Sequence, residues 1–329
     1  MTNATTPVRF GIIGTGGIAS DFTRDLALLP EADVVAVGSR QQSSADAFAD
    51  EHAIGRRHAS YAALAADPEV DVVYVATPHP GHHAAARLAI DAGKAVLVEK
   101  PFTMNAAEAL DLVTAAGERG TFVMEAMWSR FTPHLVRVRE IVASGVLGTL
   151  TTVVADHAQW FPGDPTHRLL APEMGGGALL DLGIYPVSFA SMVLGPPSRV
   201  TARSTPTATG VDAQTSILLE HEAGAHAVLT TTLRAAGSNR ATVVGTDGRI
   251  EIDATWYAPT TFTLTTRDGQ VTRYDEAHQG RGLRHQCAEV VRCLRAGLTE
   301  SPVMPADETV SIMRTMDEVR RQIGLTHPV

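Results

Sequence analysis

Cysteine is almost absent from this 329-residue sequence, which contains only Cys287 and Cys293. The two lie six positions apart in one predicted helix and therefore on different faces of it. Reduced thiols in a cytoplasmic protein are the simplest account of so little cysteine. We therefore expect a cytoplasmic location.

Long apolar runs and positive charge are also scarce. No run approaches the ~20 apolar residues of a membrane-spanning helix, so we expect no membrane partner. The opening residues, Met1 to Pro7, have neither the basic start nor the apolar stretch of a signal peptide. Lys and Arg number 27 against 36 Asp and Glu, and the net charge of −9 argues against a nucleic-acid partner.

The length and the composition, 44% hydrophobic and 19% charged, suit two globular domains. Residues 1–126 alternate strand and helix. The predicted strands after the first are Asp33–Ser39, Val70–Ala76, Ala95–Val98 and Phe122–Glu125. This alternation predicts an α/β fold with a doubly wound parallel sheet.

A G-x-G-x-x-A motif joins the first strand to the first helix. Gly14 allows a sharp turn, Gly16 lets the backbone approach a pyrophosphate, and Ala19 lets helix and strand pack closely. The free N–H groups of the helix N-terminus would then bind the diphosphate. A glycine-rich loop without a ligand is the alternative. The expected contacts of the diphosphate are Gly14, Thr15, Gly16, Gly17 and Ile18.

The end of the second strand predicts which dinucleotide binds. An NAD site usually has an acidic residue there to hold the ribose 2′-hydroxyl, whereas this strand ends in Ser39 and Arg40. Asp33 lies at the other end of the strand. Arg40 would bind a 2′-phosphate, so we expect NADP(H) rather than NAD(H). The alternative is that Arg40 is a solvated loop residue.

Two further strands end in polar residues at the edge of the sheet where ligands of open α/β folds bind. The third predicted strand runs into Thr77-Pro78, with histidines following, and the fourth into Glu99-Lys100-Pro101. Nothing nearby completes a metal site, so we expect no metal. A lysine beside a cofactor can bind a substrate oxygen and ease the transfer of its proton. The expected cofactor contacts here are Thr77, Pro78, His82, Glu99 and Lys100.

From residue 127 onward the strands shorten and alternate. The turns Asp247-Gly248 and Asp268-Gly269 are strong hairpin signals, and 222–224 is a weaker one. These signals predict an antiparallel sheet, interrupted by one helix over about Gly175–Leu194 and followed by two C-terminal helices.

The inserted helix contains Asp181 and Tyr185, which are four positions apart and therefore share one helix face. A carboxylate and a phenol so placed can hold a substrate hydroxyl and transfer its proton. A helix-start acid and a buried tyrosine are the structural alternative. Four more residues are candidate substrate contacts, since aromatic faces suit sugar rings and arene diols, although core or interface roles compete. They are Trp128, Arg130, Trp160 and Arg168.

The motifs at Gly14–Ala19, Ala76-Thr77-Pro78 with His82, and Glu99-Lys100-Pro101 resemble the glucose–fructose oxidoreductase/inositol dehydrogenase/MocA family. The resemblance covers nearly the whole chain. It implies a Rossmann domain, residues 1–126, and a substrate-binding and oligomerisation domain, residues 127–329. The second domain would be an α/β domain whose open, mostly antiparallel sheet forms a homodimer interface, and the last helix would pack back on the first domain.

Family members often have a histidine where this chain has Tyr185. The tyrosine, like the stretch Glu125–Phe131, resembles the branch of dihydrodiol dehydrogenases and NADP-dependent xylose dehydrogenases. In this interpretation Tyr185 exchanges the substrate proton, Lys100 favours the ionised phenol, and Asp181 orients the substrate.

We therefore expect an NADP(H)-dependent oxidoreductase acting on a secondary alcohol or carbonyl of a sugar, cyclic diol or sugar-like compound. A ketoreductase for a nucleotide-linked deoxysugar is the alternative within enzymes. A non-catalytic NADP-binding sensor is the alternative outside them, although such a sensor does not need Lys100, Asp181 and Tyr185 together.

Overall fold

The computed structural model describes residues 6–161, 163–164, 167–275 and 277–328, and the chain divides into two compact units. The first unit comprises Met1–Phe131 and Gln279–Val310, and the second comprises Thr132–His278 and Ser311–Val329. The first unit thus contains a segment from near the end of the chain as well as residues 1–126. Residues 1–5, to which most of the signal-peptide analysis applied, lie outside the described residues.

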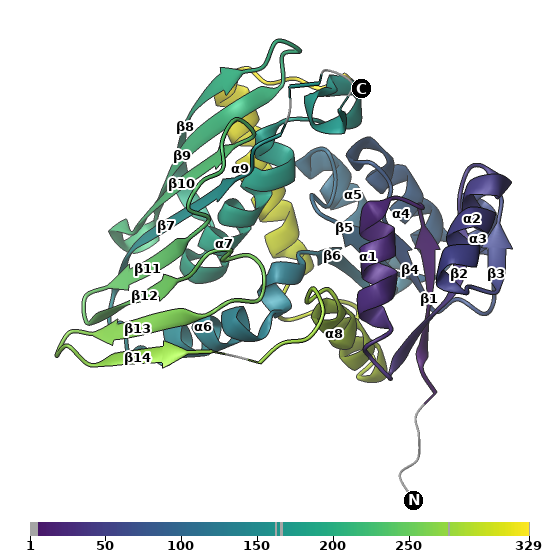
Figure 1. Ribbon diagram of the computed structural model, residues 1–329, viewed down its shortest axis with the longest axis horizontal. Coiled ribbons are helices and arrows are strands. Elements are labelled where there is room, and N and C mark those ends of the chain that lie inside the picture. The colour runs from purple at the N-terminus through teal and green to yellow at the C-terminus, as the bar shows by residue number, and fades with distance from the viewer. Residues whose placement is uncertain (1–5, 162, 165–166, 276, 329) are drawn as a thin grey trace, which may run out of the picture. The chain divides into compact units, whose positions relative to one another are not determined.

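The first unit is built on a six-stranded parallel sheet with the order β3-β2-β1-β4-β5-β6 (Figure 1). The strands are β1 (Val8–Ile13), β2 (Ala32–Gly38), β3 (Arg56–His58), β4 (Val72–Val75), β5 (Ala95–Glu99) and β6 (Val123–Ala126). The predicted doubly wound sheet is confirmed, and its order reverses between β1 and β4, where ligands of such folds bind. The sequence analysis missed β3, because its residues Arg-Arg-His carry no apolar signal.

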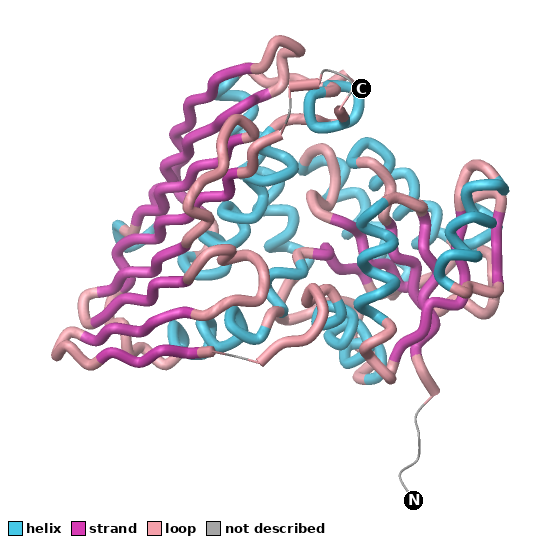
Figure 2. The backbone as a smooth tube through the Cα atoms, in the orientation of Figure 1, coloured by secondary structure: helices cyan, strands magenta, loops and turns pink. Residues whose placement is uncertain are grey.

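Helices connect these strands, as the alternating colours of Figure 2 show. They are α1 (Gly17–Leu26), α2 (Gln42–His52), α3 (Tyr61–Ala65), α4 (His82–Asp91) and α5 (Ala106–Arg119), with α8 (Arg284–Arg295) from the later segment. Asp25 of α1 fastens that segment, because its carboxylate accepts the backbone N–H groups of Arg281 and Arg284 at 2.7 and 2.8 Å. One buried carboxylate therefore satisfies two backbone donors before and at the start of α8.

The second unit contains an eight-stranded sheet with the order β14-β13-β12-β11-β7-β10-β9-β8 (Figure 1). The strands are β7 (Leu150–Ala158), β8 (Pro197–Pro206), β9 (Asp212–His221), β10 (His226–Thr232), β11 (Ala241–Gly245), β12 (Gly248–Ile252), β13 (Phe262–Thr266) and β14 (Val271–Tyr274). The three predicted hairpins are present. The predicted mostly antiparallel sheet is confirmed, and within it β7 and β10 pair in parallel.

Helices cover one face of this sheet. They are α6 (Pro133–Ala143), the π-helical segment η5 (Leu179–Gly183), α7 (Ile184–Leu194) and most of α9 (Ala306–Ile323). The helix predicted from Gly175 thus begins only at about Leu179, and Asp181 lies in its wide π turn. Pro172–Leu194 is long and apolar enough to span a membrane, with a mean hydropathy of 1.5. This corrects the expectation that no such run exists, but 83% of the window is buried, as in a core helix.

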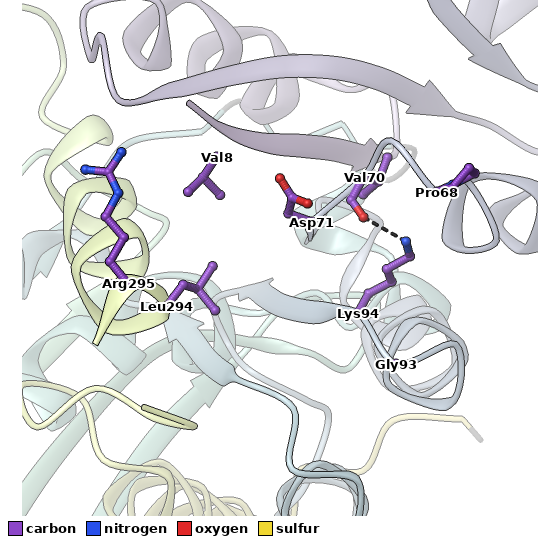
Figure 3. Close-up of a pocket in the computed structure, with 8 residues that line it drawn as sticks. All are labelled: Val8, Pro68, Val70, Asp71, Gly93, Lys94, Leu294 and Arg295. Carbon is purple, nitrogen blue, oxygen red and sulfur yellow. Dashed lines mark hydrogen bonds between the residues drawn. The ribbon is translucent and has the colours of Figure 1, made fainter. Parts of the chain in front are cut away.

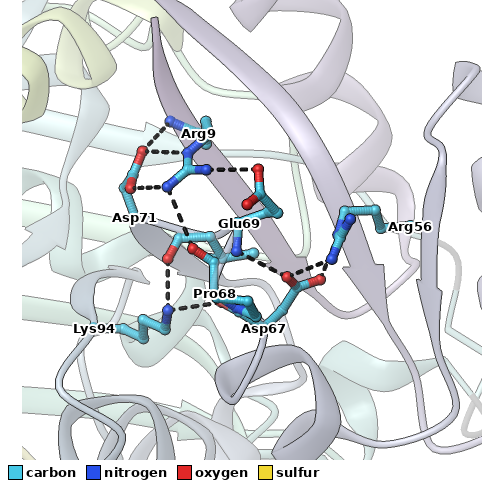
Figure 4. Close-up of polar contacts among 8 residues, drawn as sticks. Arg9, Arg56, Asp67, Pro68, Glu69, Asp71 and Lys94 are labelled. Atoms are coloured by element: carbon cyan, nitrogen blue, oxygen red, sulfur yellow. Dashed lines mark hydrogen bonds and ion pairs between the residues drawn. The ribbon is translucent and has the colours of Figure 1, made fainter. Parts of the chain in front are cut away.

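The Asp67 carboxylate is the centre of a cluster of polar contacts at the amino edge of the parallel sheet (Figure 4). The buried Asp67 side chain accepts two hydrogen bonds from the Arg56 guanidinium, at 2.7 and 2.9 Å. It also lies 2.9 Å from the His58 ring and accepts the Glu69 N–H at 2.9 Å. The Arg56 hydrogen bonds hold the pKa of Asp67 well below its usual range. The ionised carboxylate therefore stabilises the fold.

Replacing this carboxylate by its amide isostere, Asp67→Asn, should lower the free energy of unfolding at neutral pH by about 2 kcal/mol. Because the pKa is lower in the folded state, wild type keeps this stabilisation above about pH 4 and loses it as the pH falls further. Asp67→Asn should lack that acid-dependent loss. Urea unfolding between acidic and neutral pH measures both effects.

Asp50→Asn is the matched control, since the exposed Asp50 carboxylate pairs with Arg57 at the surface. It should change the unfolding free energy by less than about 0.5 kcal/mol. Equal losses in the two variants would contradict the role given to Asp67.

Candidate active site

The glycine turn after β1 has the geometry that a diphosphate site needs. Gly14 has a φ of +108°, and a Cβ there would lie 2.5 Å from the carbonyl oxygen of Ala76, so only glycine fits. A Cβ at Gly16 or Gly17 would meet no protein atom within 4 Å. Internal packing therefore does not require glycine at these two positions, whereas a ligand lying against the start of α1 would. The residues present fit a dinucleotide.

The end of β2 lies beside this turn, because Gly14 donates its N–H to the carbonyl of Gly38 at 3.1 Å. Ser39 is half-buried and Arg40 is exposed. Within the described ranges the Arg40 side chain makes no ion pair. Its guanidinium is thus not engaged by a carboxylate of the described residues.

His82 connects the two polar loops that the sequence analysis singled out. The ring is buried, with Nδ1 2.8 Å from the carbonyl of Pro101 and Nε2 2.8 Å from the carbonyl of Thr77. Burial lowers the pKa of His82 to about 4. Both ring nitrogens of His82 thus lie against backbone carbonyls, and the ring connects the loops after β4 and β5.

The loop that carries Lys100 is held by two buried carboxylates as well. Glu99 accepts the Tyr74 hydroxyl at 2.5 Å with one oxygen and the Lys100 N–H at 3.1 Å with the other. Glu125 accepts the Phe102 N–H at 3.1 Å, and burial raises the pKa of Glu125 to about 7. Three successive residues, Lys100, Pro101 and Phe102, thus each have a backbone group in contact with a different buried side chain. These side chains are Glu99, His82 and Glu125. These three buried side chains therefore set the backbone position of Lys100.

Trp128 and Arg130, two candidate substrate contacts, lie in the 3-10 helix η2 (Trp128–Phe131) and are buried. The Arg130 guanidinium donates to Glu308 at 2.7 Å and to the carbonyl of Val303 at 3.4 Å. These contacts favour a structural role for Arg130, which joins η2 to the later segment of the first unit.

The second unit brings together two of the predicted residues. The Arg168 guanidinium donates to Asp181 at 3.2 Å, and Asp181 is buried while Arg168 is half exposed. Tyr185 is also buried, at the start of α7. Trp160, by contrast, is 65% exposed.

Sequence reasoning missed an aromatic cluster around Tyr185. The His157 ring lies edge-on to Tyr185 at 5.0 Å and stacks on Tyr257 at 3.8 Å between ring centroids. Gln159 donates to the Tyr257 hydroxyl at 3.2 Å. The alternation of β7 could have placed His157 on the buried face, but Tyr257 lies in a loop with no periodic signal.

Sequence reasoning also missed Asp212, the first residue of β9. Its buried carboxylate accepts the N–H of Leu179, at the start of the helix that carries Asp181 and Tyr185, at 2.8 Å. Burial raises the pKa of Asp212 to about 7.

A cavity of about 470 Å³ in the first unit lies at the opposite edge of the sheet from these loops (Figure 3). Its lining includes Val8 and Asp71, which begin or precede β1 and β4, and Lys94, which donates to the carbonyl of Val70 at 2.7 Å. It is therefore separate from the predicted cofactor site. In the part of the chain that the structure describes, no three His, Cys, Asp or Glu side chains are grouped to hold a metal ion.

Comparison with known proteins identifies the family. Residues 8–127 match the oxidoreductase family with an NAD-binding Rossmann fold, and residues 135–251 match the GFO/IDH/MocA C-terminal domain. The chain is 41% identical over 332 residues to a trans-1,2-dihydrobenzene-1,2-diol dehydrogenase from Macaca fuscata fuscata and 38% identical over 330 residues to the Homo sapiens enzyme of that name. Each alignment covers 98% of both chains.

Two solved structures show the same architecture. An aldose-aldose oxidoreductase from Caulobacter crescentus, complexed with glycerol, has a TM-score of 0.87 at 25% identity and covers 96% of this chain and 97% of its own. A 3-ketoreductase from Actinomadura kijaniata, complexed with NADP and TDP-benzene, has a TM-score of 0.85 at 26% identity and covers 97% and 98%. The family predicted from the motifs is confirmed: this chain is an oxidoreductase of the Gfo/Idh/MocA family with an NAD(P)-binding Rossmann fold.

Proposed function

We propose that this protein is an NADP(H)-dependent oxidoreductase acting on a secondary alcohol or carbonyl of a sugar, cyclic diol or sugar-like compound. The observation that carries the proposal is the buried Asp181, paired with Arg168 one turn before Tyr185, in a chain whose full-length relatives are named diol dehydrogenases. A cytoplasmic location is part of the proposal and is supported by two buried, unpaired cysteines.

When bound, the nicotinamide supplies the hydride acceptor or donor. Gly14 to Ile18 hold the diphosphate, Ser39 and Arg40 the 2′-phosphate, and the loops at Thr77-Pro78 and Glu99-Lys100 the nicotinamide end. His82 contributes by fixing the distance between those loops.

The proton is transferred by the chain's own residues. Tyr185 accepts the proton of the substrate hydroxyl in oxidation and returns it in reduction. A free phenol has a pKa of about 10, and the positive charge of Lys100 favours the ionised form. Asp181 binds a substrate hydroxyl, which orients the carbon that loses hydride. Trp128, Trp160 and Arg168 contribute substrate contacts, and Arg130 positions Trp128.

A second candidate is favoured by one observation. The Actinomadura kijaniata neighbour, solved with NADP and TDP-benzene, is a 3-ketoreductase. A nucleotide-linked keto-sugar is therefore the alternative substrate class. A non-catalytic NADP sensor remains the alternative outside enzymes.

The first test follows reduced-nicotinamide absorbance with NADP⁺ and then NAD⁺ over xylose, glucose, inositols and a cyclic trans-diol. Turnover with NADP⁺ supports the proposal. No turnover, with NADP(H) still binding tightly, favours the ketoreductase or the sensor.

Cofactor choice is tested at the end of β2. Arg40→Ala removes a charge-assisted contact to the 2′-phosphate and should raise the KM for NADP⁺ by roughly 10–100-fold, with the KM for NAD⁺ nearly unchanged. Arg57→Ala, which removes another arginine of the same unit, is the control. A parallel rise for both cofactors would refute NADP selection by Arg40.

The acid–base role is tested at the phenol. Tyr185→Phe should lower kcat roughly 10²–10⁴-fold because the proton loses its acceptor, while NADP(H) affinity measured by fluorescence titration stays unchanged. Tyr257→Phe removes a neighbouring phenol of the same aromatic cluster and should leave kcat nearly unchanged. Near-normal turnover of Tyr185→Phe would remove Tyr185 from the mechanism.

We also propose that two copies pair through the open face of the eight-stranded sheet. Val228 lies in register with Val154 on β7 and Leu218 on β9, and all three side chains are exposed, at 44%, 44% and 36%. Such an aliphatic row across three central strands suits a self-complementary two-fold interface.

Val228→Arg places a charge in this row and should convert the dimer to a monomer in sedimentation velocity runs. Leu298→Arg, at an exposed leucine of the first unit, should leave the mass unchanged. A wild-type protein that sediments as a monomer at all concentrations would disprove the dimer.

A further inference from the structure

The two glycines before η5 form a turn that packs against the loop containing Arg168. Gly176 donates its N–H to the carbonyl of Ala171 at 3.1 Å, and Gly177 donates to that of Leu169 at 2.8 Å. A Cβ at Gly176 would lie within 2.9 Å of three carbonyl oxygens of this loop. The backbone of the turn is therefore packed closely against the backbone of the loop.

The Asp212 carboxylate packs against the other side of the same turn. Gly177 has a φ of +115°, and a Cβ there would lie 2.2 Å from Asp212 Oδ1. The second oxygen, Oδ2, accepts the Leu179 N–H at 2.8 Å and the Thr215 hydroxyl at 2.7 Å. The carboxylate thus contacts the turn with one oxygen and the first helical N–H with the other.

This arrangement is more than a helix cap. Within the described residues, Asp212 Oδ1 is buried and has no hydrogen-bond partner, so the bonds to Oδ2 hold it against Gly177. An unpartnered buried carboxylate oxygen costs free energy, and the bonds made by Oδ2 must offset that cost. Thr215 on the same strand orients Oδ2, so the carboxylate cannot rotate without losing a bond.

We infer that Asp212 is a positioning residue for the Arg168–Asp181 pair. The turn that Asp212 supports is bonded to the loop of Arg168 on one side and leads within four residues to Asp181 on the other. The 3.2 Å separation of the two side chains therefore depends on the Asp212 contacts. The consequence for substrate orientation rests on the proposed function.

Asp212→Ala should lower kcat roughly 10–100-fold, because misplacing a substrate-orienting group by about 1 Å has an effect of that size. The KM for NADP⁺ should not change. Asp212→Asn keeps an oxygen acceptor for the Leu179 N–H and should restore most of kcat. The matched control is Asp253→Ala, whose carboxylate also accepts a threonine hydroxyl. Its partners among the described residues are Arg240, Thr261 and Arg273, away from the Gly177 turn.

A double-mutant cycle separates positioning from general destabilisation. Gly177→Ala alone should lower kcat for two reasons: its Cβ would displace the Asp212 carboxylate, and a φ of +115° strains any residue with a Cβ. In the Asp212→Ala background the clash is gone and only the backbone strain remains, so the two losses should combine to less than their product. Losses that multiply, or a kcat loss in Asp253→Ala equal to that in Asp212→Ala, would overturn the inference.

Hydrogen exchange gives a readout that needs no turnover. The Leu179 amide and its neighbours at 177–181 should exchange faster in Asp212→Ala than in wild type, Asp212→Asn or Asp253→Ala. Unchanged exchange in folded Asp212→Ala would refute the positioning role. Failure of the proposed function would appear separately, as a wild-type protein without turnover on any substrate of the panel.

Discussion

The fold depends on hydrogen-bond partners for the backbone groups of loops that follow the strands. Such loops have no neighbouring strand to supply these partners. A buried peptide N–H or carbonyl with no partner costs free energy, and these loops lie outside the ladder. In the first unit, buried side chains supply the partners: Glu99 and Glu125 accept N–H groups and His82 contacts two carbonyls. The backbone of the loop with Lys100 is therefore bonded to buried side chains in place of a neighbouring strand.

The second unit meets the same requirement with a carboxylate and two glycines. The turn at Gly176–Gly177 bonds backward to the loop of Arg168, and Asp212 binds the first N–H of the segment that follows. The backbone comes too close to its neighbours there for any side chain. In both units, a buried carboxylate accepts a backbone N–H of a segment that carries a residue of the proposed mechanism.

Family membership fixes the type of chemistry but not the substrate, because function depends on the site and not on the fold. The groups expected to be common to the reaction, Lys100 and the helix with Asp181 and Tyr185, are held by buried contacts. Trp160, a candidate substrate contact, is exposed.

The sequence by itself determined the parallel sheet, the glycine turn, the hairpins and the family, because each has a local signal: continuous apolar runs, G-x-G-x-x-A, Asp-Gly pairs and Glu-Lys-Pro. It also indicated Asp181 and Tyr185, which lie four positions apart in consecutive helical segments. Only the tertiary structure showed that Arg168 pairs with Asp181, that His157 and Tyr257 surround Tyr185, and that Asp212 supports the Gly177 turn. The tertiary structure also decided the parallel pairing of β7 with β10 and the formation of the edge strand β3. These contacts join residues far apart in the chain or lacking periodic signals, so no spacing in the sequence encodes them.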